Sequence, residues 1–170
     1  AVEVDLGLLE LGAALRQRRL GGGELGLGDG DLGAGDLAIP GGGVDGSLGG
    51  DAASGELLLS GDGALVKDGS GTVVINTSGN SYTGGTTINA GRLGLNFSDG
   101  LGSGTVVIAA GAELGIGGIT LANSVSGAGS IVKTGGFTAN LTGTNTHSGG
   151  LDIQGGAVNV TGNAALGSGP

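Results

Sequence analysis

The 170-residue chain contains no cysteine, methionine or tryptophan, and has only one tyrosine and two phenylalanines. The absence of cysteine excludes a disulfide framework, a cysteine-ligated zinc site and a thiol nucleophile. With so few aromatic residues, the chain cannot form a globular core that rests on large aromatic anchors. Six basic residues against 15 acidic ones give a net charge of −9, which disfavours binding to nucleic acids and to anionic membranes.

Long apolar runs are also missing, and none approaches the roughly 18 residues of a membrane-spanning helix. No signal peptide is recognised, so we expect a mature chain or an internal segment. Glycine accounts for 45 residues, but it does not recur at every third position and there are only two prolines, which excludes collagen. A charged fraction of 12% is low for a disordered chain. The composition therefore predicts an ordered, glycine-rich, all-β protein.

Residues 61–104 and 127–169 are two copies of one unit. The sequence Gly-Asp-Gly-Ala-Leu-Val-Lys at 61–67 aligns with Gly-Ala-Gly-Ser-Ile-Val-Lys at 127–133, and both copies end in Leu-Gly-Ser-Gly. The alignment holds over most of the unit with a single deletion in the second copy. Sequence self-similarity at a fixed period predicts stacked, similar substructures, that is, a solenoid.

The strand signal over residues 55–170 is a set of apolar pairs at positions i and i+2. Each pair fits one short strand with two inward side chains, and no helical stripe of apolar residues is present. The pairs are Val73/Ile75, Leu93/Leu95, Val106/Ile108, Leu114/Ile116, Ile119/Leu121 and Val158/Val160. We therefore predict a parallel β-helix, with about three rungs of roughly 20–25 residues in each 65-residue unit.

Equivalent positions in the two copies carry similar polar side chains. The pairs are Lys67/Lys133, Asn80/Asn145 and Asn89/Gln154. Because amide side chains on successive strands can form hydrogen-bonded ladders, we expect these positions to suit stacking.

Residues 1–54 are less regular and form the first of two predicted regions. Residues 2–8 alternate as a strand does, whereas residues 8–20 fit either irregular structure or a short helix. Residues 25–27 and 36–39 are predicted as weak strands. The region is interpreted as degenerate β-helix rungs, with a poorly ordered stretch as the alternative.

The residue types that could carry chemistry do not form a site in the sequence. His147 is the only histidine, and its counterpart in the first copy is Tyr82, which favours a packing role over general-base catalysis. The acidic residues of the repeat region are Asp62, Asp68, Asp99, Glu113 and Asp152. None has a repeated carboxylate partner, so we predict no enzyme activity and no catalytic, cofactor-binding or metal-binding residues.

Two stretches of the first region need separate consideration. Residues 28–37 weakly resemble a calcium-binding glycine/aspartate nonapeptide, but the nine-residue spacing is not sustained, and a solvated acidic turn is the expectation. Arg16-Gln17-Arg18-Arg19 is predicted to be an exposed loop, with a protease-sensitive processing site as the alternative.

Residues 69–75 and 80–93 resemble the passenger-associated transport repeat of bacterial autotransporter proteins. The resemblance lies in Gly-Ser-Gly-Thr-Val-Val-Ile, followed by Asn-Ser-Tyr-Thr-Gly-Gly-Thr-Thr-Ile-Asn-Ala-Gly-Arg-Leu. Lys67 supplies the leading lysine of the repeat, and the Leu-Gly-Ser-Gly ending is also typical. The second copy diverges, with His147 in place of Tyr82.

The resemblance implies a right-handed parallel β-helix that is exported across the outer membrane of a Gram-negative bacterium and displayed on its surface. It implies a C-terminal outer-membrane β-barrel of the same protein as a partner, which these 170 residues do not include. The predicted function is adhesion or cell–cell self-association through a polar face, with the same chain on neighbouring cells or host surface molecules as partners. The alternative is a structural stalk that assists secretion, with recognition located elsewhere in the protein. We expect no small-molecule substrate and no cofactor.

Overall fold

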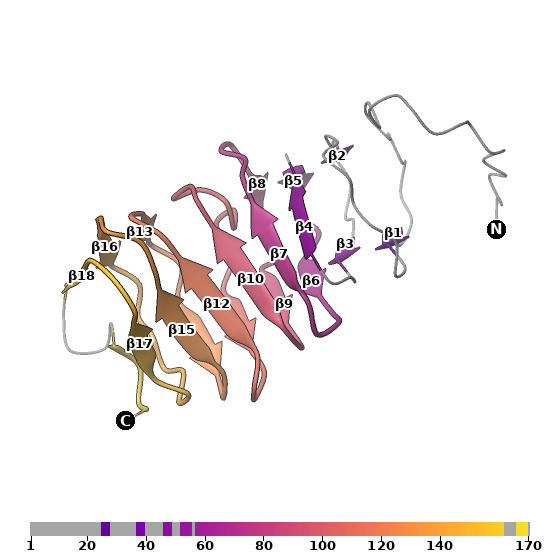
Figure 1. Cartoon of the computed structure of the whole chain (residues 1–170). Coiled ribbons are helices and arrows are strands. Elements are labelled where there is room, and N and C mark those ends of the chain that lie inside the picture. The colour runs from indigo at the N-terminus through magenta and orange to yellow at the C-terminus, as the bar shows by residue number, and fades with distance from the viewer. Residues whose placement is uncertain are drawn as a thin grey trace, which may run out of the picture.

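The computed structural model describes residues 57–161 and 166–169, together with four strands between residues 25 and 55. All strand pairs in these residues are parallel, and consecutive rungs stack along one axis (Figure 1). The described residues contain no α-helix, and therefore none that could span a membrane. The predicted all-β parallel solenoid is confirmed.

The solenoid has three sides, which we call sides 1, 2 and 3. Side 1 is a six-stranded sheet of β1 (Leu25–Leu27), β3 (Gly46–Leu48), β6 (Leu65–Lys67), β9 (Thr86–Ile88), β11 (Val106–Ile108) and β14 (Val125–Gly127). Side 2 is a six-stranded sheet of β4 (Ala52–Gly55), β7 (Thr72–Ile75), β10 (Arg92–Leu95), β12 (Glu113–Ile116), β15 (Ser130–Lys133) and β17 (Leu151–Ile153). Side 3 has two three-stranded parts, β2 (Leu37–Ile39), β5 (Leu57–Gly61) and β8 (Ser81–Tyr82), then β13 (Thr120–Leu121), β16 (Thr138–Leu141) and β18 (Ala157–Val160).

The length of a rung follows from residues that are bonded between neighbouring rungs. Asn76 and Asn96, whose side chains are hydrogen-bonded, are 20 residues apart in the chain. On side 1, Leu65 of β6 is in register with Thr86, Thr86 with Val106, and Val106 with Val125 of β14. Val125 therefore lies three rungs beyond Leu65 on the same side. Ile131, the sequence equivalent of Leu65, lies one strand further, on β15. The offset of 66 residues between equivalent positions of the two copies therefore spans three rungs and one additional side, close to the predicted three rungs.

The additional side rotates the second copy of the unit about the solenoid axis. Strand β6 lies on side 1, whereas its sequence equivalent β15 lies on side 2. In the same way β7, β9 and β10 correspond to β16, β17 and β18, each moved to the next side. Equivalent residues of the two copies consequently face different directions and do not stack on one another.

The core consists of aliphatic side chains that alternate along the strands. The predicted inward pairs from Val73/Ile75 to Ile119/Leu121 are all buried. The final pair differs, because Val158 is only partly buried and Val160 is 40% exposed. These two residues are in register with Ala139 and Leu141 of the preceding rung, which are buried. Strand β18 is the last strand of side 3, so no described strand covers these two side chains.

Glycine permits the close stacking of rungs where each copy carries Gly-Gly. The amide of Gly84 donates to the carbonyl of Gly63 at 3.0 Å, and a Cβ on Gly84 would lie 2.5 Å from that carbonyl carbon. In the second copy Gly149 makes the same bond to Gly129 at 3.1 Å. The local structure of the repeat is therefore preserved although its side of the solenoid is not.

The two weak strands predicted in the first region are present, as β1 and β2. Strands β1 and β2 pair in parallel with β3 and β5. The strand predicted over residues 2–8 and the helix considered over 8–20 lie outside the described residues.

Candidate functional site

His147 is fully buried in the structure, as is its counterpart Tyr82, at 0% and 2% exposure. Neither ring nitrogen of His147 has a hydrogen-bond partner. Burial lowers the pKa of His147, and the nearby backbone of Gly150 acts in the opposite direction. The imidazole thus occupies a packing position that a substrate in solvent does not reach.

Lys67 is a buried cation that is held by carbonyl groups. Its ammonium donates to the carbonyls of Asp68 at 2.7 Å, Gly69 at 2.8 Å and, from the next rung, Ala90 at 3.2 Å. Its side chain has no exposed surface. The lysine therefore joins two rungs at the corner that follows β6.

Lys133 makes the same arrangement one side further around the solenoid. Its ammonium donates to the carbonyls of Thr134, Gly135 and Gly155 at 2.5, 3.0 and 3.0 Å. The similarity of Lys67 and Lys133 in the two copies thus reflects a common corner structure, and the two lysines are not stacked.

The amides at equivalent positions are also separated. Asn80 accepts a hydrogen bond from the amide of Leu59 at 2.6 Å and donates to the carbonyl of Gly100 at 2.8 Å. Asn145 accepts from the amide of Val125 at 2.9 Å. The prediction that Asn80 and Asn145 suit stacking on each other is wrong, because the one-side rotation of the second copy places them on different sides.

Amide ladders do form between neighbouring rungs. The side chain of Asn96 donates to that of Asn76 on side 2. On side 3, Asn159 donates to Asn140 at 3.2 Å, and Asn140 donates to the Thr120 hydroxyl at 3.3 Å. The partners are 19 or 20 residues apart, which is the signal in the sequence that would have identified them.

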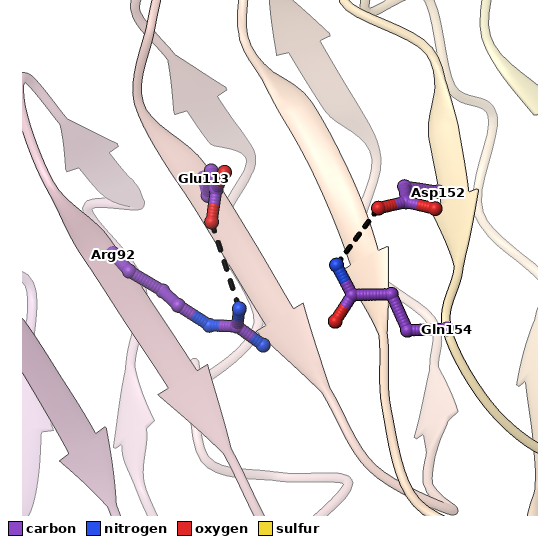
Figure 2. A network of polar contacts seen from close by, with 4 residues as sticks. All are labelled: Arg92, Glu113, Asp152 and Gln154. Atoms are coloured by element: carbon purple, nitrogen blue, oxygen red, sulfur yellow. Dashed lines mark hydrogen bonds and ion pairs between the residues drawn. The ribbon is translucent and has the colours of Figure 1, made fainter.

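Glu113 and Asp152, two of the acidic residues of the repeat region, have different partners. Arg92 and Glu113 form an ion pair of 3.6 Å across adjacent strands of side 2, and Gln154 donates to Asp152 at 2.8 Å (Figure 2). Both side chains of the ion pair are accessible, so it adds little to stability.

Asp68 and Asp99 are engaged elsewhere. Asp68 accepts from the Asn89 side chain at 2.8 Å, and Asp99 accepts from the amide of Gly79 at 2.7 Å. Across the described part of the chain, no group of three His, Asp or Glu side chains gathers as metal ligands would. Of the calcium-like stretch at 28–37, residues 28–36 lie outside the described residues, and so does the arginine cluster at Arg16-Gln17-Arg18-Arg19.

The model of the passenger-associated transport repeat matches residues 65–95 and 131–160. Both matches fall within the two units found in the sequence, and each begins at the strand that ends in a buried lysine. The chain therefore carries two passenger-associated transport repeats, which implies a segment of an autotransporter passenger. No curated protein and no solved structure matches the chain.

Proposed function

We propose that this chain is part of a passenger displayed on the surface of a Gram-negative bacterium, where it mediates adhesion or cell–cell self-association through the sides of its solenoid. The main support is the row of polar side chains along side 3, Thr120, Asn140 and Asn159, one from each of three successive rungs. Such a row offers weak hydrogen bonds at a regular spacing. These contacts become strong in sum when many copies face each other on two cells.

The distribution of charge also favours contact between copies. Residues 1–68 contain 12 acidic and 4 basic residues, whereas residues 69–170 contain 3 acidic and 2 basic ones. Because residues 69–170 are nearly neutral, like-charge repulsion does not oppose the approach of two such segments.

We further propose that the segment acts without catalysis, cofactor or small-molecule substrate. The single imidazole is buried without hydrogen-bond partners, and the acids described above bind to separate neighbours. General acid–base catalysis needs such groups within reach of one substrate atom, an arrangement that the described residues do not provide.

The second candidate function is a stalk that assists secretion, with recognition elsewhere and the outer-membrane barrel of the same protein as partner. It is favoured by the continuous hydrogen bonding between rungs, since a solenoid can fold from one end and propagate. Ordered folding outside the cell would help to draw the chain outward.

Display of the segment on non-aggregating cells separates the two functions. Self-association predicts that displaying cells sediment together, and adhesion predicts that they bind host matrix, while cells that display an unrelated β-solenoid do neither. If displaying cells stay dispersed and bind no matrix, the adhesive function is wrong for this segment, and the stalk function is retained.

A further inference from the structure

Two exposed phenylalanines stand out on a chain that has only three aromatic residues. Phe137 is 80% exposed and Phe97 is 42% exposed, whereas Tyr82 is 2% exposed. A phenyl ring is among the side chains with the most to gain from burial, so its exposure to water is costly in a protein that stays alone.

Both rings lie along one edge of the solenoid, where the strands of side 2 end. Phe97 follows β10 and Phe137 follows β15, while Gly117 and Gly118 follow the intervening strand β12 (Figure 1). The amide of Gly117 donates to the carbonyl of Leu95 at 3.3 Å, which places the glycines one rung above Phe97. We call Phe97, Gly117, Gly118 and Phe137 the phenylalanine edge.

At this edge, the rung between the two rings has only Gly117 and Gly118 and therefore carries no side chain. The Cβ of Phe137 packs directly against Gly118, so only glycine fits there. A Cβ on Gly117 would meet no atom closer than 3.7 Å, so the position has room that no side chain fills. Two rungs separate the phenylalanines, a spacing of about 10 Å along the axis for neighbouring strands about 4.8 Å apart.

The same edge carries little charge. Residues 114–132 and 134–151 contain no Asp, Glu, Lys or Arg, although the chain as a whole carries a net charge of −9. Asp99, the acid nearest to Phe97 in the sequence, is hydrogen-bonded to the amide of Gly79. The phenylalanine edge thus combines exposed aromatic surface with weak like-charge repulsion, which suits contact with a second copy of this chain.

We infer that the phenylalanine edge is a self-association surface at which two copies pack in antiparallel orientation. A two-fold axis at the Gly117 rung sets Phe97 of one copy against the partner's Phe137, and Phe137 against the partner's Phe97. In such an interface each contact occurs twice by symmetry. The bare glycine rung lets the two edges approach closely at the axis.

This inference rests on the proposed self-association and names the surface that carries it. A contact between two narrow edges buries far less than the roughly 1,200 Å² of a stable interface, so single pairs dissociate readily. Many such pairs between two cells act together, which is the situation of a displayed passenger.

The experiment measures the sedimentation of cells that display the segment, with amounts on the surface matched by antibody. The double variant F97S/F137S is expected to lose most of the sedimentation. The control V107S removes an apolar side chain of 40% exposure from side 1 and is expected to keep it. Circular dichroism of the purified segments checks that all variants fold alike.

Mixing the single variants tests the antiparallel arrangement. Cells with F97S alone, or F137S alone, have no Phe–Phe contact in an antiparallel pair, whereas an F97S cell and an F137S cell regain one. We therefore expect mixed cells to sediment faster than either variant alone. If each variant alone sediments faster than the mixture, the antiparallel arrangement is wrong.

The experiment separates a failure of the phenylalanine edge from a failure of self-association itself. If parent cells sediment and F97S/F137S cells sediment equally, the phenylalanine edge is wrong and self-association stands. If parent cells stay dispersed, self-association and the role of this edge are both overturned.

Discussion

The hydroxyl oxygens of Tyr82 and Thr86 lie 2.6 Å apart in the interior of the first transport repeat. At the equivalent positions the second repeat has His147 and Leu151, and the buried imidazole has no hydrogen-bond partner. Burial raises the pKa of Tyr82 to about 12, with the hydrogen bond to Thr86 acting in the opposite direction, so the phenol stays neutral. The buried polar side chain at this position thus has a hydrogen-bond partner in the first copy and none in the second.

The unsatisfied histidine predicts that acid weakens the protein. Burial lowers the pKa of His147 in the folded state below its unfolded value of about 6.5. Below that pH the unfolded chain binds more protons than the folded one, so the free energy of unfolding falls as the pH drops from 7.5 to 5.

Urea unfolding at several pH values measures this dependence, with His147→Tyr as control. The variant lacks the imidazole and is expected to show a smaller change with pH over the same range. An unchanged slope would assign the acid sensitivity to other groups.

Thr86→Val is predicted to destabilise the protein by about 1–3 kcal/mol, because it leaves the buried Tyr82 hydroxyl without a partner. The matched control is Thr87→Val on the same strand, where the side chain is half-buried and points outward. This control is expected to change stability by less than about 0.5 kcal/mol. Equal effects of the two variants in chemical denaturation would show that the Tyr82–Thr86 bond contributes nothing.

Lys133→Met tests the lysines that join successive rungs. The substitution keeps an unbranched side chain but leaves the carbonyls of Thr134, Gly135 and Gly155 without their common donor. We expect a loss of about 1–3 kcal/mol in the free energy of unfolding. Arg92→Met, which removes the solvent-accessible ion pair with Glu113, is expected to cost less than about 1 kcal/mol. A larger loss for Arg92→Met than for Lys133→Met would contradict the account.

Gly84→Ala is predicted to destabilise the stack of rungs by more than about 2 kcal/mol, since its Cβ would collide with the backbone of Gly63. Gly136→Ala is the control, because a Cβ there meets nothing within 4 Å. The melting temperatures of the two variants measure the difference. Similar values would mean that the rungs are further apart at Gly84 than the structure shows.

The strands could be predicted from the sequence because their signal is local. Pairs such as Leu93/Leu95 and Leu114/Ile116 alternate with small or polar residues, and alternation at period two defines an inward face. The repeat indicates that such strands stack. Alternation and repetition together are sufficient to predict the parallel solenoid.

The rotation of the second copy could not be predicted in the same way. It depends on how the offset between the copies compares with the length of a rung, and the rung length is set by turns that the apolar pattern does not reveal. For the same reason the apolar pattern does not reveal Asn76 and Asn96 as neighbours, and the similarity of the two copies points to Asn80 and Asn145 instead.

The buried lysines were visible in the sequence only as similar residues. Lys67 lies two positions after Leu65, and Lys133 lies two positions after Ile131. Both lysines therefore occupy inward-facing positions of their strands. A lysine at an inward-facing position near the end of a strand therefore indicates a corner whose carbonyls bind its ammonium. Phe97 and Phe137 gave no such signal, because each is a single apolar residue in a turn.

The rotation of the second repeat by one side is the central claim, and engineered disulfides test it most directly, since the chain has no cysteine of its own. Glu113 and Ser130 are register partners on side 2, and neighbouring strands are about 4.8 Å apart, within the range that a disulfide spans. Thr105 directly precedes Val106 of β11, just as Ser130 directly precedes Ile131 of β15. If both copies shared side 1, Ser130 would therefore lie near Thr105. The account predicts that E113C/S130C forms an intramolecular disulfide under mild oxidation and that T105C/S130C does not. Rapid cross-linking of T105C/S130C, with none in E113C/S130C, would contradict it.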